Sequence, residues 1–165
     1  MHSLHLLLNR LADAGIDFVV VGGFAGMLHG SALLTNDVDV CAVLSPENVK
    51  KIRAAFADLH PVHRQTHGRF SFLTHPAPGT PVANLYLETD QGIIDVLSSV
   101  LGVGDFSRLK ARAIEIPLHG RTIALISLED LIVAKEAIGR EKDLLAVKEL
   151  KAIAAKRRGE AGRQS

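Results

Sequence analysis

The chain has 165 residues, of which 47% are hydrophobic, and its formal net charge at pH 7 is +1. A chain of this length forms about one domain with a sizeable core of its own. The small net charge excludes the strong basic field of a nonspecific nucleic-acid binder, and no apolar run approaches the ~20 residues that cross a bilayer. We therefore expect one domain over residues 1–156 that does not span a membrane.

The N-terminal sequence and the cysteine content bear on the cellular location of the protein, and the C-terminal sequence bears on its order. The N-terminal sequence lacks a basic leader and a small-residue cleavage site, and the single cysteine, Cys41, cannot form an internal disulfide. Both features favour a reducing, cytoplasmic location. The sequence after Lys156 is basic and ends in Gly, Arg, Gln and Ser, so we expect residues 157–165 to form a disordered tail.

The first quarter of the chain alternates between helical and strand patterns. Leucines at helical spacing predict a helix over residues 2–14. An apolar strand at residues 18–21 then leads into Gly22-Gly23, which opens a short helix. A second strand follows at about residues 37–43.

The remaining sequence predicts further helices and an antiparallel meander. The expected strands lie at Val62, 70–73, 82–87 and 93–97, with a small hairpin over residues 112–125. The expected helices lie at 45–59, 106–111, 127–138 and 140–156. The fold class is therefore α/β (α+β), with a mixed, mostly antiparallel sheet flanked by helices.

Two acidic side chains on the second strand suggest a site. Asp37 and Asp39 are one residue apart, so on a strand they point to the same side of the sheet. Paired carboxylates suit Mg²⁺, which binds through one or two carboxylates plus substrate phosphates. The glycines Gly22 and Gly23 let backbone N–H groups approach phosphate oxygens closely. The stretch therefore predicts a site for a nucleoside triphosphate and a divalent metal.

These same residues resemble the signature of a known family. Gly22-Gly23, followed by Thr35-x-Asp37-Val38-Asp39, resembles the DNA polymerase β-type nucleotidyltransferase superfamily, and is most similar to its small bacterial AbiEii/MenT toxin-type and minimal members. The resemblance covers roughly residues 18–150 and implies the nucleotidyltransferase fold. It implies that Asp37 and Asp39 hold two metal ions, Mg²⁺ or alternatively Mn²⁺. It also implies that Asp95, inside a later apolar strand, is the third metal-binding carboxylate and helps to activate the attacking hydroxyl.

Other site residues are candidates with two interpretations. Thr35 either contacts a phosphate or caps the turn before the acidic residues. The run from Lys135 to Asp143 is similar to an element of the AbiEii-like branch, which makes Lys135 and Arg140 candidates for binding the triphosphate. The alternative is a solvated helix face on which Glu136 and Arg140 pair at i, i+4.

The sequence departs from the family pattern at two positions. Many relatives have serine where this chain has Gly23, and many have arginine where it has Leu33. Gly23 offers a phosphate only its backbone N–H. The chain must either do without the missing arginine or supply another cation, such as Arg69. These departures weaken the expected binding of the triphosphate.

The resemblance implies a metal-dependent nucleotidyltransferase. Such an enzyme transfers a nucleoside monophosphate from an NTP to an acceptor hydroxyl and releases pyrophosphate. The acceptor stays open among a tRNA end, a protein and a small molecule. The alternative is a catalytically weak nucleotide-binding or interaction module, such as one component of a toxin–antitoxin pair with a partner protein.

Overall fold

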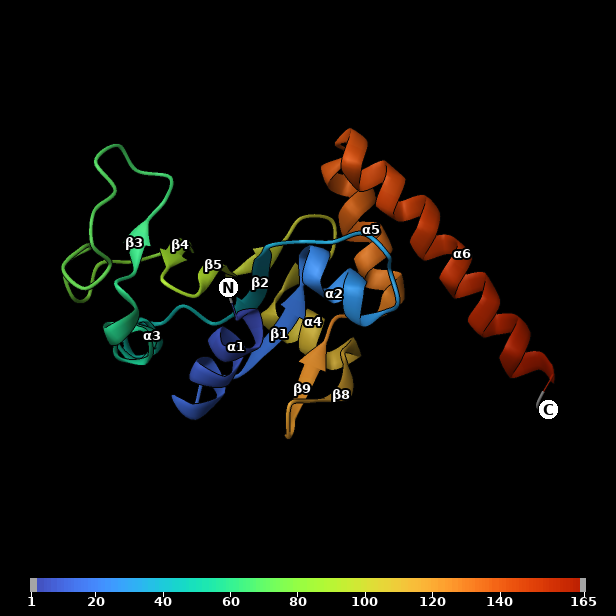
Figure 1. Cartoon of the computed structure of the whole chain (residues 1–165), viewed down its shortest axis with the longest axis horizontal. Coiled ribbons are helices and arrows are strands. Elements are labelled where there is room, and N and C mark those ends of the chain that lie inside the picture. Colours follow the sequence, from blue (N-terminus) through green and yellow to red (C-terminus); the bar gives the residue numbers. More distant parts are fainter. Residues whose placement is uncertain (1–2, 164–165) are drawn as a thin grey trace.

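The computed structural model describes residues 3–163, which form a seven-stranded sheet with helices around it (Figure 1). The strands of this sheet are β1 (Phe18–Val21), β2 (Asp37–Ala42), β3 (Val62–His63), β4 (Asn84–Thr89), β5 (Gly92–Leu97), β8 (Ile114–Leu118) and β9 (Arg121–Leu125). The helices are α1 (Leu4–Asp13), α2 (Gly22–Leu28), α3 (Pro46–Ala55), α4 (Phe106–Arg112), α5 (Leu128–Ile138) and α6 (Glu141–Arg163), with a 3₁₀ turn η1 at Ala57–Leu59. A separate two-stranded hairpin pairs β6 (Ser99–Val100) with β7 (Gly104–Asp105).

The sheet is mixed and mostly antiparallel, in the order β3-β4-β5-β2-β1-β9-β8. Strand β2 pairs antiparallel with β1 and parallel with β5, and β9 pairs parallel with β1. The other three pairs, β3–β4, β4–β5 and β8–β9, are antiparallel. The predicted fold class is confirmed.

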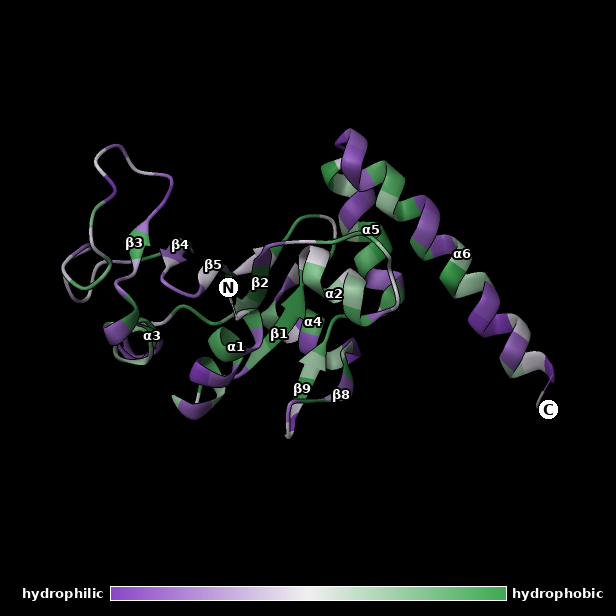
Figure 2. Cartoon of the chain, viewed as in Figure 1, coloured by the Kyte–Doolittle hydropathy of each residue, from purple (hydrophilic) through white to green (hydrophobic). Residues whose placement is uncertain are grey.

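The central strand explains why the core forms where it does. All four residues of β1 are buried, and Figure 2 shows this strand as hydrophobic along its length. Strand β2 alternates instead, with Val38 and Val40 fully buried and Asp37 and Asp39 partly exposed. The apolar residues of β2 therefore join the core, and its two carboxylates face the opposite side of the sheet.

Local sequence signals set several helix ends. Ser45 accepts a hydrogen bond from the N–H of Asn48 at the start of α3, and Ser127 accepts one from the N–H of Asp130 at the start of α5. These serines satisfy backbone donors that the first turn of a helix leaves free. Gly139 ends α5 with a left-handed backbone (φ +69), as expected of a glycine at that position.

The meander was predicted only in part. Residues 70–73 do not form a strand, and only an isolated bridge joins Ser71 to Val62. Strand β4 begins at Asn84 rather than at residue 82. The long β3–β4 connection contains turns and prolines that interrupt pairing, which leaves β4 and β5 as the regular hairpin of this region.

Helix α6 extends to Arg163, well past the expected end at residue 156 (Figure 1). The predicted tail therefore forms the last turns of this helix, except for residues 164–165, which lie outside the described residues. Hydrogen bonds tie α6 to the chain between α2 and β2. Arg157 Nη2 donates to the carbonyl of His29 (2.8 Å), and Glu149 accepts from the hydroxyl of Ser31 and the N–H of Ala32 (3.0 Å). These distant contacts, which composition does not reveal, hold α6 against the α2–β2 loop.

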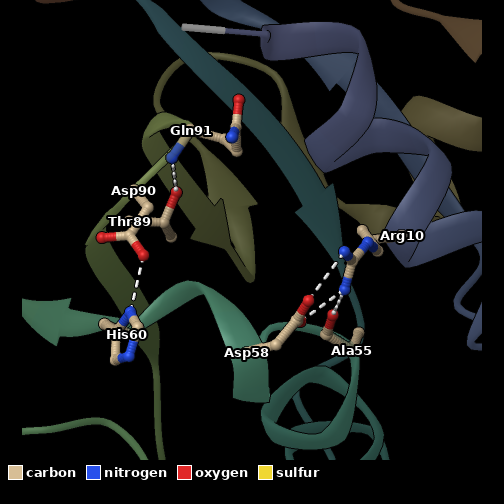
Figure 3. A network of polar contacts seen from close by, with 7 residues as sticks. All are labelled: Arg10, Ala55, Asp58, His60, Thr89, Asp90 and Gln91. Carbon is tan, nitrogen blue, oxygen red and sulfur yellow. Dashed lines mark hydrogen bonds and ion pairs between the residues drawn. The ribbon is translucent and has the colours of Figure 1, made fainter.

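A second group of polar contacts holds the opposite flank of the sheet (Figure 3). Arg10 of α1 pairs with Asp58 of η1 (2.6 Å) and donates to the carbonyl of Ala55 (3.1 Å). His60 lies 2.6 Å from Asp90 in the β4–β5 turn, and this carboxylate raises the pKa of the imidazole. These contacts join α1 to η1 and to the end of α3, and join the residue after η1 to the β4–β5 turn.

Helix composition also bears on membranes. Within residues 3–163, no helix combines the length and apolar character that crossing a bilayer requires.

Candidate active site

The three predicted carboxylates come from two neighbouring strands. Asp39 of β2 lies directly opposite Asp95 of β5 in the parallel ladder. Because paired residues on adjacent strands point to the same face, both carboxylates lie on one side of the sheet, with Asp37 two residues along the same strand. Tyr86 of β4 pairs with Asp95 from its other side. A row of side chains therefore crosses the sheet from Tyr86 through Asp95 to Asp39.

These side chains line a cavity of about 620 Å³ between the sheet and the α5–α6 pair. Seven of the predicted site residues line it: Gly23, Thr35, Asp37, Asp39, Asp95, Lys135 and Arg140. A cavity of this size is within the usual range for a small-molecule site. The sequence therefore identified residues from four distant segments that the fold brings together.

Gly22 is the predicted site residue that does not line the cavity, because it lies behind Asp39. Its backbone is left-handed (φ +70), and a Cβ built on it would lie 2.2 Å from Oδ2 of Asp39. A glycine is therefore required here by the carboxylate of Asp39 as well as by the turn. The prediction that Gly22 approaches a phosphate stays a prediction.

Gly23 and Thr35 face each other at the cavity wall. A Cβ at Gly23 would lie 3.3 Å from Cβ of Thr35, so the glycine leaves room for the threonine. The hydroxyl of Thr35 accepts from the N–H of Asp37 at 3.3 Å. Thr35 thus caps the start of β2, and its place in the cavity wall also leaves its predicted phosphate contact open.

Asp37, Asp39 and Asp95, which we call the carboxylate row, have electrostatics that favour the binding of a cation. Burial, together with the charges of Asp95 and Asp37, raises the pKa of Asp39 to about 6, against the opposing effect of Lys135 and Arg64. Burial also raises the pKa of Asp95, which the nearby Arg64 counteracts. The row therefore carries repulsion that an added positive charge relieves.

Arg64, which follows β3, is a site residue that the sequence did not predict. Its Nε lies 3.3 Å from Oδ1 of Asp95, and its Nη2 donates to Oδ2 of the same carboxylate. Its guanidinium carbon lies 5.6 Å from the centre of the Tyr86 ring. No local pattern marks Arg64, because its role depends on pairing between β3 and β4. Arg69, which the sequence suggested as the extra cation, instead pairs with Glu88 and does not line the cavity.

On the opposite wall, a buried carboxylate holds the two predicted cations. The side chain of Asp143 is only 1% exposed and lies 2.6 Å from Nε of Arg140 and 3.6 Å from Nζ of Lys135. Burial raises the pKa of Asp143, but Arg140 and Lys135 outweigh it, so the pKa falls below its ordinary value. Asp143 therefore fixes the position of both cations. Glu136 and Arg140 do not form the i, i+4 pair of the alternative interpretation, because Arg140 pairs with Asp143 and Glu136 pairs with Lys151 of α6.

Replacing Asp143 with asparagine is expected to lower the free energy of unfolding by about 2 kcal/mol at pH 7, because two paired cations lose their buried counter-charge. Since the folded pKa of Asp143 is lowered, the difference between wild type and variant should disappear as pH falls through that pKa. Urea denaturation at several pH values measures this. The control is Glu141→Gln, an exposed residue on the same turn, and equal losses in both variants would contradict the prediction.

The carboxylates of β2 meet part of the ligand requirement of Mg²⁺. Asp37 and Asp39 present two carboxylates on one face, which fits an ion that completes its shell with phosphate oxygens and water. Within residues 3–163, however, no three His, Cys, Asp or Glu side chains gather closely enough to form a metal cluster by themselves. The residues present therefore fit a metal that is shared with a bound triphosphate.

Comparisons with solved structures agree with this architecture. The lincosamide antibiotic adenylyltransferase LnuA, solved with lincomycin, is 16% identical and superposes with a TM-score of 0.62 over 92% of this chain and 98% of that one. ANT(2'')-Ia in complex with adenylyl-2''-tobramycin is 14% identical, with a TM-score of 0.55 over 98% and 96%. At such identities these likenesses establish the fold alone.

Comparisons of sequence give the family. No curated protein matches the chain. A family model described as "nucleotidyl transferase of unknown function (DUF2204)" matches residues 1–164. Because that match spans nearly the whole chain, including both strands that carry the carboxylate row, this protein belongs to the DUF2204 nucleotidyl transferase family.

Proposed function

We propose that this protein transfers a nucleoside monophosphate from an NTP to a hydroxyl group of a small molecule, with Mg²⁺ or Mn²⁺ as cofactor. The observation that carries the proposal is the carboxylate row. Asp39 and Asp95 lie opposite each other on parallel strands, with Asp37 beside them, and all three line one cavity.

The residues of the cavity have distinct roles in this reaction. The acceptor oxygen forms a bond to the α-phosphorus, the bond from that phosphorus to the β-phosphate oxygen breaks, and pyrophosphate leaves. Asp95 accepts the proton of the attacking hydroxyl. Asp37 and Asp39 would hold the divalent metal, which when bound neutralises charge on the triphosphate. Lys135 and Arg140 bring positive charge to the opposite wall, where it offsets the charge of the phosphates.

Two considerations support a small acceptor. The cavity volume suits a nucleotide with a small partner. Of the structural neighbours, LnuA was solved with lincomycin and ANT(2'')-Ia with adenylyl-2''-tobramycin. The chain also carries few aromatic side chains, 4% of its residues, on which the bases of a single-stranded RNA would stack. A tRNA end and a protein hydroxyl remain the alternatives to be tested beside it.

The test is transfer of label from α-³²P-labelled NTPs. The protein is incubated with each NTP and either Mg²⁺ or Mn²⁺, and a mixture of hydroxylated small molecules, bulk tRNA or cellular protein is added. We expect labelled small-molecule product that EDTA prevents and that Asp37→Asn does not form. Transfer only to tRNA or protein would overturn the acceptor class, and absence of transfer to any acceptor would overturn the enzyme assignment.

A second candidate function is a nucleotide-binding or interaction module with weak turnover. The observation in its favour is that Arg64 already pairs with Asp95, the group proposed to accept the proton. The run from Lys135 to Asp143 supports placement near the AbiEii/MenT-like branch, and with it a toxin–antitoxin role. NTP binding without label transfer, measured in the same assay, would favour this second function.

A cytoplasmic location stays a prediction.

A further inference from the structure

The Arg64–Asp95 pair is built into the sheet rather than formed by chance at the surface. The backbone N–H of Arg64 donates to the carbonyl of Tyr86 at 3.0 Å, which extends the β3–β4 ladder by one residue. The guanidinium then lies near the Tyr86 ring and reaches both oxygens of Asp95. Backbone and side chain are thus both fixed, so little conformational freedom remains to be lost when the pair forms.

The pair is also shielded from solvent. The side chains of Arg64 and Asp95 are 26% and 11% exposed. Charges interact more strongly in such a place than at the surface, because water screens them less. The Arg69–Glu88 pair in the same part of the chain is 55% and 43% exposed and lies outside the cavity, which makes it a natural comparison.

A carboxylate held in this way is a poor ligand for a second cation. Both oxygens of Asp95 already accept hydrogen bonds from Arg64. A divalent ion that approaches the same oxygens meets the repulsion of a fixed positive charge at close range. The ion and the guanidinium therefore compete for one carboxylate, and this agrees with the absence of a ready-made three-ligand cluster among residues 3–163.

We propose that Arg64 is a positioning residue that keeps divalent metal away from Asp95 until the triphosphate arrives. In the nucleotide-free protein, only Asp37 and Asp39 would then be available as protein ligands for the ion, so the ion would bind weakly. The negative charge of the triphosphate draws the ion into the row and offers Arg64 another anionic partner. The inference rests on the proposed function in one respect, that Asp95 belongs to the metal and nucleotide site.

The test measures Mn²⁺ binding to the nucleotide-free protein by the electron paramagnetic resonance signal of free Mn²⁺. Arg64→Gln is expected to bind Mn²⁺ at least about tenfold more tightly than wild type, because one nearby positive charge is removed. Arg64→Lys keeps the charge but loses the two-point contact, so its affinity should lie in between. The control Arg69→Gln should stay within about twofold of wild type, because its ion pair is exposed.

A further variant shows whether Asp95 is the group for which the cations compete. The double variant Arg64→Gln/Asp95→Asn should lose the gain in Mn²⁺ affinity. Circular dichroism melting checks that each variant folds, and should Arg64→Gln not fold, Arg64→Lys decides alone. Unchanged or weaker Mn²⁺ binding by the folded Arg64 variants would overturn the inference even if the wild type transfers nucleotides. A gain in Mn²⁺ affinity without nucleotide transfer would overturn the proposed function and leave the inference standing.

Discussion

Replacing Asp39 with asparagine is expected to reduce nucleotide transfer strongly and at the same time make the protein more stable at pH 8. The folded pKa of Asp39, about 6, lies above its ordinary value of 3.8. The folded state therefore favours the protonated carboxyl, and this contribution is complete below the unfolded pKa and lost as pH rises through about 6. At pH 8 the wild type bears the full penalty of a buried, repelled charge, which asparagine removes.

The expected gain in the free energy of unfolding at pH 8 is about 2 to 3 kcal/mol, from a shift of about two pKa units. The gain should vanish near pH 3.5, where aspartic acid and asparagine are both neutral. Activity should fall on the order of 10³-fold, because catalysis requires the negative charge of Asp39, whereas the folded state is destabilised by it. Urea denaturation with EDTA at both pH values, together with the label-transfer assay, measures both effects.

The control for this variant is Asp17→Asn. Asp17 forms an exposed pair with Lys110 and does not line the cavity, so its loss should change neither activity nor the pH dependence of stability appreciably. If Asp39→Asn were less stable than wild type at pH 8, the explanation of the carboxylate row as a site of stored repulsion would be wrong.

Replacing Gly22 with alanine is expected to have the second large effect. The left-handed backbone alone costs an alanine about 1 kcal/mol or more. The new methyl group would also lie 2.2 Å from Oδ2 and 3.0 Å from Cβ of Asp39, so the carboxylate would have to move out of the row. We expect a loss of stability of about 2 to 4 kcal/mol in total and a fall in transfer activity on the order of 10²-fold or more.

Gly15→Ala separates these two contributions. Gly15 has nearly the same left-handed backbone (φ +77), but a Cβ there has no neighbour within 4 Å. The control variant should therefore lose only the backbone contribution, about 1 kcal/mol, and keep its activity. Thermal unfolding and label transfer of both variants provide the comparison. Equal effects would show that Asp39 does not require the glycine.

The sequence predicted the parts of the site that depend on local pattern. Strand alternation put Asp37 and Asp39 on one face, and the resemblance added Asp95 as the third carboxylate. The structure adds the reason that they meet, which is the parallel pairing of β2 with β5. That pairing joins strands about fifty residues apart in the chain, so no local window of sequence contains it.

Two features depended on such distant contacts and were missed or wrong in the sequence analysis. Arg64 directly follows a two-residue strand, β3, that is too short to produce a periodic signal, and it reaches Asp95 only because β3 pairs with β4. The stretch from Arg157 was expected to be disordered because of its composition. Its place in α6 is instead supported by the hydrogen bond to His29, which lies 128 residues earlier in the chain.

The attachment of α6 to the α2–β2 loop has a consequence for how the protein folds during its synthesis. Ser31 and Glu149 are 118 residues apart in sequence, and His29 and Arg157 are 128 apart. Contacts between such distant segments form late, because closing a long loop costs more entropy than closing a short one. During synthesis on the ribosome, the loop that leads to Asp37 emerges more than a hundred residues before its anchor. A nascent chain can therefore pair its first strands, but the loop that leads to the carboxylates gains its final shape only after Glu149 and Arg157 have been made.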